Sequence, residues 1–250
     1  MIKLIVSGVL GKMGKEIVSL SIEFKDIDVI AGFDKKRGDI SIPIKNKIDE
    51  LPHRFDAIVD FSSPDAAIKM LKFSLKSKKP FVTGTTGFTE KEEKEIKRVS
   101  KKIPVFKASN MSMGINAVMA ILEDLPDILY NDFDVEIVEM HHRFKKDSPS
   151  GTAIILGKTI AKRIGKETFL YGREGKKLKR KKGDVSFHSV RGGTVVGIHT
   201  IYFHGNDESI EITHRAYSRR IFAFGALTAV RWIIQQKPGL YSMDDLLSKD

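Results

Sequence analysis

The chain has 250 residues, of which 41% are hydrophobic, 20 are glycine and none is cysteine, and it carries a net charge of +11. This length suits one large domain or two of ordinary size, and the composition excludes collagen-like, low-complexity and wholly disordered chains. The lack of cysteine excludes disulfides, thiolate metal sites and cysteine nucleophiles. An opening apolar run too short for a secretory signal, and no run near the roughly 20 apolar residues of a membrane helix, favour the cytosol.

Residues 1 to 110 alternate short apolar runs with amphipathic segments, which is the rhythm of repeated βαβ units around a parallel sheet. Strands are predicted at 3–8, 28–34, 56–62, 80–87 and 104–110, and helices at 12–24, at 64–79 and after residue 89. Ser63 with Pro64 starts the second helix, and a capping box of Thr89 with Glu92 starts the third. We therefore expect an α/β, Rossmann-like, doubly wound dinucleotide-binding domain over residues 1–112.

The pattern changes from about Gly114. One long apolar helix is predicted at 115–130, a strand at 134–140 and a helix at 150–165, followed by three strand-like runs at 185–191, 194–205 and 208–216. Consecutive strands without intervening helices favour an antiparallel or mixed sheet. Residues 113–217 are thus expected to form an α+β second domain. The apolar helix at 220–236 needs covering, so residues 218–250 are expected to rejoin the first domain.

Three glycines, Gly8, Gly11 and Gly14, follow the first predicted strand directly and open the first helix. Glycine lets backbone amides approach a pyrophosphate at the positive end of a helix. The G-x-x-G-x-x-G spacing is a variant of the dinucleotide fingerprint, so a glycine-rich turn without a ligand stays open as an alternative.

Asp34 lies 20 residues after Gly14, where an acidic side chain accepts hydrogen bonds from an adenosine ribose. Lys35, Lys36 and Arg37 follow it and could pair with a 2′-phosphate instead. We expect both NADH and NADPH to be used.

The stretch HHRFKKDSPSGTA, residues 141–153, places histidines and cations before a predicted helix start. The amides of Gly151 and Thr152 at that start suit a carboxylate, and Lys145 lies a few residues upstream. A small acid held there would leave a histidine or lysine within reach for proton transfer. Neighbouring histidines on a strand point to opposite faces, so one could be structural instead. Adjacent histidines also lack the spacing of the helical zinc motif, so no metal is expected.

The stretch EMHHRFKKDSPSGTA closely resembles the signature of the 4-hydroxy-tetrahydrodipicolinate reductase family, also called dihydrodipicolinate reductase, of bacterial lysine biosynthesis. The resemblance covers nearly the whole chain, because further motifs occur in the family's order: GVLGKMG, DFSSP, GTTGF, SNMSMGIN, YGREG, SVRGGTVVGIHT and EITHRAYSR. It implies reduction of a cyclic dicarboxylic acid in the diaminopimelate route, in which 4-hydroxy-tetrahydrodipicolinate and NADH or NADPH give tetrahydrodipicolinate, the oxidised cofactor and water.

The resemblance also implies roles for particular residues. His141 would be the proton donor or acceptor, Lys145 a proton donor, and His142, Gly151 and Thr152 substrate contacts. The implied cofactor contacts are Gly8, Val9, Leu10, Gly11, Lys12, Met13, Asp34, Lys35, Gly84, Thr85, Thr86, Ala108, Ser109, Asn110 and Met111. Met111 departs from the family, which usually has an aromatic residue there. A homotetramer built through second-domain sheets is implied too, as is domain closure about hinges near 110–114 and 217–220.

Two other readings remain. Another Rossmann oxidoreductase of a small carboxylic acid would share this fold, because a fold does not fix a substrate. The charge and the basic block KKLKRKK, residues 176–182, could mark a nucleic-acid binder. That block has no interleaved aromatic residues, so a solvated loop is the simpler interpretation and no nucleic-acid partner is expected.

Overall fold

The computed structural model describes residues 1–36, 38, 40–176 and 179–248. The chain divides into two compact units, one made of Met1–Met113 with Arg219–Asp250 and the other of Gly114–Ser218. Within the described ranges, none of the helices is both long enough and apolar enough to cross a bilayer.

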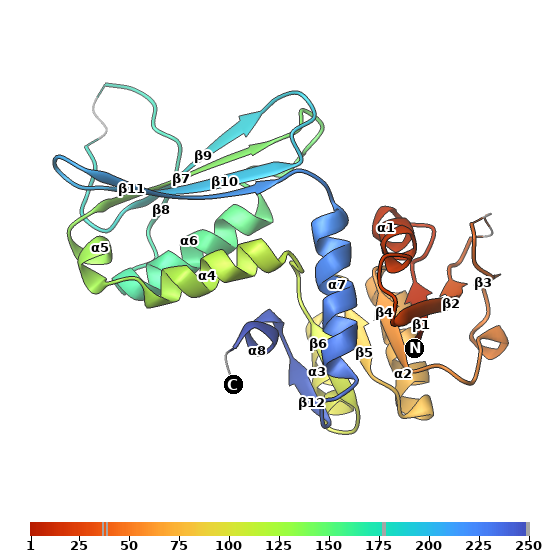
Figure 1. Ribbon diagram of the computed structural model, residues 1–250. Helices are drawn as coiled ribbons and strands as arrows, with labels where there is room; N and C mark the ends of the chain where they lie inside the picture. Colours follow the sequence, from red (N-terminus) through yellow and green to blue (C-terminus); the bar gives the residue numbers. More distant parts are fainter. Residues whose placement is uncertain (37, 39, 177–178, 249–250) are drawn as a thin grey trace. The chain divides into compact units, whose positions relative to one another are not determined.

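The first unit is built on a seven-stranded sheet in the order β12-β6-β5-β4-β1-β2-β3 (Figure 1), and every strand pairing in it is parallel. Its strands are β1 (Ile2–Ser7), β2 (Ile27–Phe33), β3 (Ile44–Lys45), β4 (Ala57–Asp60), β5 (Phe81–Thr83), β6 (Pro104–Lys107) and β12 (Gly239–Tyr241). Its helices are α1 (Lys12–Ser21), η1 (Ile48–Glu50), α2 (Pro64–Ser77), α3 (Glu90–Ser100), α7 (Arg220–Ile233) and α8 (Met243–Leu247).

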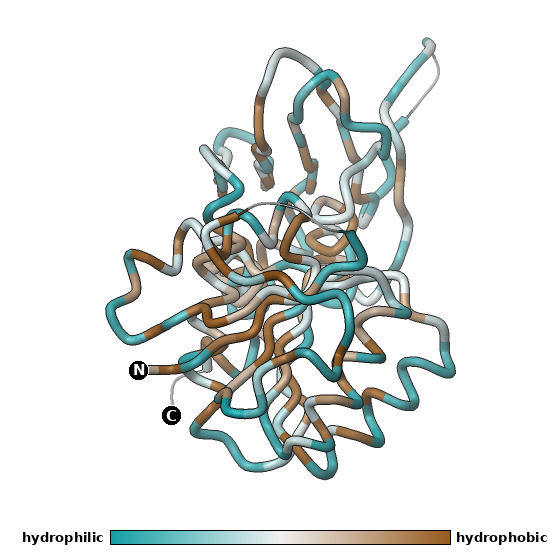
Figure 2. The backbone as a smooth tube through the Cα atoms, turned by 90° about the vertical axis from the view of Figure 1, so that its right-hand side faces the viewer, coloured by the Kyte–Doolittle hydropathy of each residue, from teal (hydrophilic) through white to brown (hydrophobic). Residues whose placement is uncertain are grey.

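Two hydrophobic clusters show that helices cover both faces of this sheet. One cluster joins the sheet to α1 and α7, and the other joins it to α2 and α3. Figure 2 shows hydrophobic colour concentrated in the central strands, whereas most connecting loops are hydrophilic. The strands read as continuous apolar runs because a parallel sheet is buried on both faces.

The second unit has a five-stranded sheet in the order β11-β10-β7-β9-β8. Strands β8 and β9 pair in parallel, as do β7 and β9, whereas β10 is antiparallel to both of its neighbours. The strands are β7 (Asp134–His141), β8 (Phe169–Tyr171), β9 (Val185–Arg191), β10 (Gly197–His204) and β11 (Ser209–Ala216), and the helices are α4 (Met113–Asp124), α5 (Asp127–Asn131) and α6 (Gly151–Ile164). Figure 1 shows α4 and α6 on one face of this sheet.

The predicted fold class is confirmed: a doubly wound parallel first sheet and a mixed second sheet. The single helix predicted at 115–130 is wrong, because the chain forms α4 and α5 separated at Leu125 and Pro126. Proline lacks the N–H that the helix ladder needs and clashes with the preceding turn. The first helix ends at Ser21 rather than 24, and the strand predicted at 194–205 covers only Gly197–His204. Strands β3, β8 and β12 were not predicted, since two or three residues carry no usable periodicity.

Candidate active site

In the first unit, the chain turns sharply after β1 on a glycine-rich loop. Gly8 adopts φ +74°, and its N–H donates to the carbonyl oxygen of Phe33 at 2.9 Å. A Cβ on Gly8 would lie 2.3 Å from the carbonyl oxygen of Phe61, and one on Gly14 would lie 2.3 Å from the carbonyl oxygen of Gly8. Side chains at these positions would displace the loop. The Val9 side chain is buried in the core, so at Val9 the loop offers backbone rather than side chain.

A pocket of about 310 Å³ adjoins this loop. It is lined by Gly8, Gly11, Phe33, Asp34, Lys35, Lys36, Phe61, Ser62, Ser63 and Ala66. The Asp34 carboxylate accepts from the backbone N–H of Leu10 and from that of Lys36, both at 3.1 Å. The acid predicted to bind ribose is therefore tied to the glycine loop itself. These residues fit the adenosine half of a dinucleotide, with lysines beside the carboxylate; Arg37 lies outside the described residues.

The loops after β4 and β5 are joined by a residue that the sequence reasoning missed. Asp60 is fully buried and accepts hydrogen bonds from the hydroxyls of Ser62 at 2.5 Å, Thr85 at 2.7 Å and Thr83 at 3.0 Å. Burial raises the pKa of the Asp60 carboxyl, and the hydroxyl groups oppose that rise. In the sequence Asp60 looks like an ordinary polar residue at the end of an apolar strand, so no local pattern marks it as part of a site.

The other predicted cofactor residues of this unit differ in exposure. Thr85 is buried and its hydroxyl also accepts from the backbone N–H of Ser62 at 2.9 Å, whereas Thr86 is exposed. A Cβ on Gly84 would lie 2.2 Å from the Phe61 ring. The Met111 side chain is only 2% exposed and belongs to the core. Two lysines of this set, Lys12 and Lys35, are exposed. The half-buried members are Leu10, Met13, Gly84, Ala108 and Asn110.

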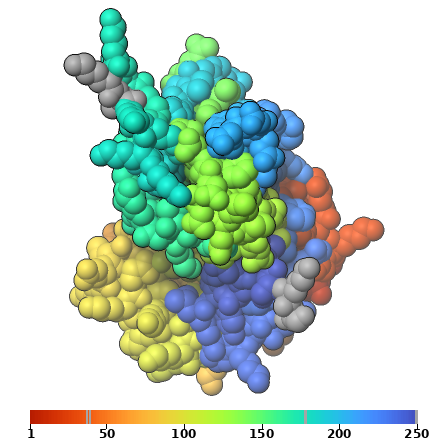
Figure 3. Space-filling view, turned by 90° about the vertical axis from the view of Figure 1, so that its left-hand side faces the viewer, coloured from red at the N-terminus to blue at the C-terminus, as the bar shows by residue number. Residues whose placement is uncertain are grey.

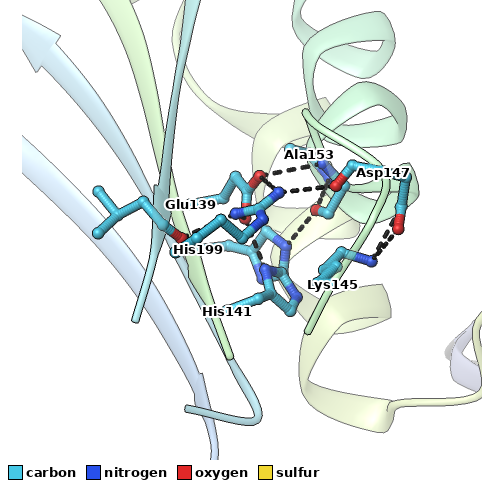
Figure 4. Close-up of polar contacts among 9 residues, drawn as sticks. Glu139, His141, Lys145, Asp147, Ala153 and His199 are labelled. Carbon is cyan, nitrogen blue, oxygen red and sulfur yellow. Dashed lines mark hydrogen bonds and ion pairs between the residues drawn. The ribbon is translucent and has the colours of Figure 1, made fainter. Parts of the chain in front are cut away.

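In the second unit, β7 ends at His141 beside a buried carboxylate (Figure 4). The Nδ1 atom of His141 lies 2.5 Å from Oε2 of Glu139, which is fully buried. Arg191 donates to both oxygens of Glu139, at 2.9 Å from Nη1 and 2.6 Å from Nη2. Burial alone would raise the pKa of the Glu139 carboxyl, but the hydrogen bonds from His141 and Arg191 outweigh it and hold that pKa well below its usual range. Neither Glu139 nor Arg191 was predicted as a site residue.

The same carboxylate holds the start of α6. Glu139 Oε1 accepts from the backbone N–H of Ser150 at 3.1 Å, and the Ser150 hydroxyl caps the helix by accepting from the N–H of Ala153 at 3.1 Å. Ser150 Oγ also lies 2.9 Å from Nε2 of His199. Burial, with a smaller contribution from neighbouring His141, lowers the pKa of His199 to about 3.

Gly151 opens α6 beside this cluster. The first amides of a helix have no acceptor inside the helix and carry the positive end of its dipole. Gly151 is exposed, and a Cβ built on it would meet no atom within 4 Å among the described residues. Thr152, next along the helix, is half-buried. The helix start thus offers open space for an anion.

Lys145 lies in the loop between β7 and α6 and is paired with an acid. Its Nζ donates to both oxygens of Asp147, at 2.8 and 2.9 Å, and this hydrogen bond lowers the pKa of the Asp147 carboxyl. His142 follows β7 in the same loop, with its ring centroid 6.3 Å from that of Phe144. The structure therefore brings His141, Lys145 and the α6 start into one region, with Asp147 as an unpredicted partner.

Two other predictions concern metal and the basic block. Across the ranges that the structure describes, no group of three or more His, Asp or Glu residues could hold a metal ion.

In Figure 3 the turquoise chain near residue 175 stands out from the surface. Arg180, within the basic block, is not a solvated loop residue: it donates to the carbonyl oxygens of Asp184 at 2.7 Å and Val135 at 3.2 Å, and pairs with Glu136. Part of the block, 177–178, falls outside the described residues.

Comparisons with known proteins match the whole chain. Residues 2–111 match the family model described as dihydrodipicolinate reductase, N-terminus, and residues 114–247 match the one described as dihydrodipicolinate reductase, C-terminus. The 4-hydroxy-tetrahydrodipicolinate reductase of Caldanaerobacter subterraneus subsp. tengcongensis is 42% identical, covering 100% of this chain and 99% of its own. The enzyme of that name from Clostridium perfringens (strain 13) is 43% identical, with 99% and 98% covered.

A solved structure agrees with these relatives. The dipicolinate-bound dihydrodipicolinate reductase of Paenisporosarcina sp. TG-14 superposes with a TM-score of 0.83 at 25% identity, covering 99% of this chain and 100% of that one. The resemblance read from the sequence motifs is confirmed. The chain belongs to the dihydrodipicolinate reductase family.

Proposed function

We propose that this protein reduces 4-hydroxy-tetrahydrodipicolinate to tetrahydrodipicolinate with NADH or NADPH, in the diaminopimelate route to L-lysine. The reaction consumes one proton and releases water. The observation that carries the proposal is the match to reductases of that name, at 42% and 43% identity, over essentially the whole chain. The two sites described above fit the proposal, since one suits a dinucleotide and the other a carboxylate.

In this proposal the first unit binds the cofactor, which supplies the hydride when bound. The backbone of residues 8–13 faces the pyrophosphate, and the positive end of α1 stabilises its charge. Asp34 accepts hydrogen bonds from the adenosine ribose, while Lys35 and Lys36 pair with a 2′-phosphate where one is present. Residues 84–86 and 108–111 surround the nicotinamide end. Because Met111 is buried in the core, its contribution there comes from the backbone.

The second unit binds the dicarboxylic acid. One substrate carboxylate sits on the amides of Gly151 and Thr152, and His142 adds a further contact. Lys145 exchanges its ion pair with Asp147, whose side chain is 60% exposed, for one with the anionic substrate. His141 and Lys145 handle the proton that the reduction needs, a role in which a positioned group typically contributes about 10² to 10⁴ in rate.

The proposal extends to assembly and location. The face of the second sheet opposite α4 and α6 carries an apolar row across three strands, where Val190 and Ile198 flank Met140. Packing of these sheets from four chains would bury the row and build a homotetramer. We further propose a cytoplasmic location, since the chain has no cysteine to form disulfides.

The first experiment follows oxidation of NADH and of NADPH separately, with substrate made in situ from pyruvate and aspartate semialdehyde by the preceding enzyme. We expect consumption of both cofactors that depends on the coupling enzyme. Failure of one cofactor at saturating substrate would refute dual use. If both cofactors bind and neither is oxidised, the enzyme is another Rossmann oxidoreductase of a small carboxylic acid.

Substitutions in the second unit test the assigned roles. His141→Ala and Lys145→Ala should each lower kcat by about 10² to 10⁴ while cofactor affinity stays the same. Matched controls are His53→Ala and Lys158→Ala, because both side chains are exposed and lie outside the site. Near-normal turnover in both folded site variants would contradict the assignment.

A further inference from the structure

We propose that Glu139 is the positioning residue of His141: it fixes a proton on Nδ1 and thereby makes Nε2 the atom that exchanges a proton with the substrate. This inference rests on the proposed function for its kinetic consequence. Its structural content, the position of a proton on one ring, does not depend on the substrate.

The tautomer follows from the contact between the two side chains. An ionised carboxylate only accepts hydrogen bonds, so the imidazole nitrogen 2.5 Å from Oε2 must carry the hydrogen. In the neutral ring the lone pair then lies on Nε2. An orienting carboxylate of this kind sets the tautomer of a catalytic histidine in other enzymes as well.

The space beside Nε2 is kept open by a glycine. A Cβ built on Gly197, at the start of β10, would lie 3.0 Å from Nε2 of His141. Any larger residue there would crowd this nitrogen. Nδ1 of the ring is therefore hydrogen-bonded to Glu139, while Nε2 is bordered by a glycine, which leaves room for a group that exchanges a proton with it.

Arg191 explains how Glu139 stays charged while buried. A fully buried carboxylate is costly unless it is paired and hydrogen-bonded. Arg191 supplies two of its hydrogen bonds, so the carboxylate keeps a cationic partner even when His141 has given up its proton. Arg191 also donates to the backbone oxygen of Asp147 at 2.8 Å. Through Arg191, Glu139 thus supports the loop that carries Lys145.

A second glutamate of β7, Glu136, also contacts a histidine and arginines, and it differs from Glu139 in what else it holds. Glu136, on the same strand, contacts His188 Nε2 at 2.7 Å and pairs with Arg173 and Arg180. It lies on the opposite face of the sheet, since residues three apart on a strand alternate faces. Of these two carboxylates, Glu139 is the one that joins a histidine to the start of a helix, through the N–H of Ser150.

A double-mutant cycle tests the proposal. Glu139→Gln should lower kcat by at least about tenfold, up to the full loss of His141→Ala, with little change in cofactor affinity. In the His141→Ala background the loss from Glu139→Gln should be at least about fivefold smaller, leaving only what Glu139 contributes through Ser150 and the loop that carries Lys145. The same fold loss in both backgrounds would mean that Glu139 acts only on the fold, and would overturn the proposal.

A measurement on the unaltered protein covers the case in which Glu139→Gln does not fold. In ¹⁵N-histidine-labelled protein at a pH where the ring is neutral, the His141 signals should show hydrogen on Nδ1, with assignment from the His141→Ala spectrum. Hydrogen on Nε2 would overturn the proposal. Absence of turnover with the tautomer as expected would instead refute the proposed substrate and leave the pairing standing.

Discussion

At the residue scale, two buried carboxylates behave in opposite ways because their donors differ. Asp60 accepts only from hydroxyl groups among the contacts found, and burial raises its pKa. Glu139 accepts from a guanidinium and an imidazole, and these hydrogen bonds overcome burial and lower its pKa. Neutral donors do not compensate a buried charge as cations do. Burial therefore disfavours ionisation of Asp60, whereas the cationic donors favour ionisation of Glu139.

These directions give Asp60 and Glu139 opposite effects on stability as the pH changes. A carboxyl whose folded pKa is raised binds its proton more tightly in the native state, so its contribution to stability falls as pH rises from the unfolded pKa of about 3.9 through the raised folded value. Asp60→Asn removes this loss. We expect the Tm of the variant, relative to the parent and measured by calorimetry, to increase with pH across that window. A difference in Tm that stays constant with pH would contradict the raised pKa of Asp60. Glu139 acts in reverse, and its contribution is lost as pH falls below the unfolded value of about 4.3.

At the element scale, two helix caps differ in whether they also contact the proposed substrate site. Thr89 caps α3 within a capping box, and Ser150 caps α6. The sequence predicted the first cap from its Thr and Glu spacing. The second cap is also joined to Glu139 and His199, which no local pattern shows.

Removing each cap should reveal that difference. Ser150→Ala and Thr89→Ala should each cost about 1 kcal/mol or somewhat more, or a fall in Tm of about 2–4 °C per kcal/mol for a chain of this size. Only Ser150→Ala should also raise KM for the dicarboxylic acid, since in the proposed function the start of α6, and not that of α3, receives a substrate carboxylate. An equal change in KM for both variants, from steady-state kinetics, would contradict the role given to the α6 start.

At the scale of the whole molecule, the sheet face of the second unit opposite α4 and α6 is the feature that bears on assembly. In the described chain, its apolar row of Val190, Met140 and Ile198 includes a side chain, Val190, that is 42% exposed. Met140 and Ile198 beside it are half-buried, and apolar surface that stays partly exposed in one chain can be covered by a protein–protein contact.

The parent protein should sediment at about four times the 28.1 kDa of one chain. Val190→Lys places a charge in the proposed contact, where burial without a partner is costly, and should shift the protein to smaller species. Lys94→Ala, on the exposed side of α3, serves as the control. A parent that sediments as a monomer at working concentration would refute the tetramer.

Much of this protein could be predicted from local sequence because its signals are local. The Rossmann architecture follows from apolar strands alternating with amphipathic helices, and the glycine loop from three glycines after the first strand. Predictions failed where a pattern ran through a proline, as at 115–130, or where a strand was too short to show a period, as in β12. That strand pairs with β6, more than 130 residues away along the chain.

The sequence by itself determined the fold class, the family and the candidate residues His141, Lys145 and Gly151, because the motifs that carry them are contiguous in the chain and can be recognised without the structure. Only the tertiary structure decided which partners those residues have. Glu139 is brought to Arg191 by the pairing of β7 with β9, 52 residues apart, and His199 to Ser150 across 49 residues. A buried charge is defined by what surrounds it in space, and sequence spacing carries no record of such long-range neighbours.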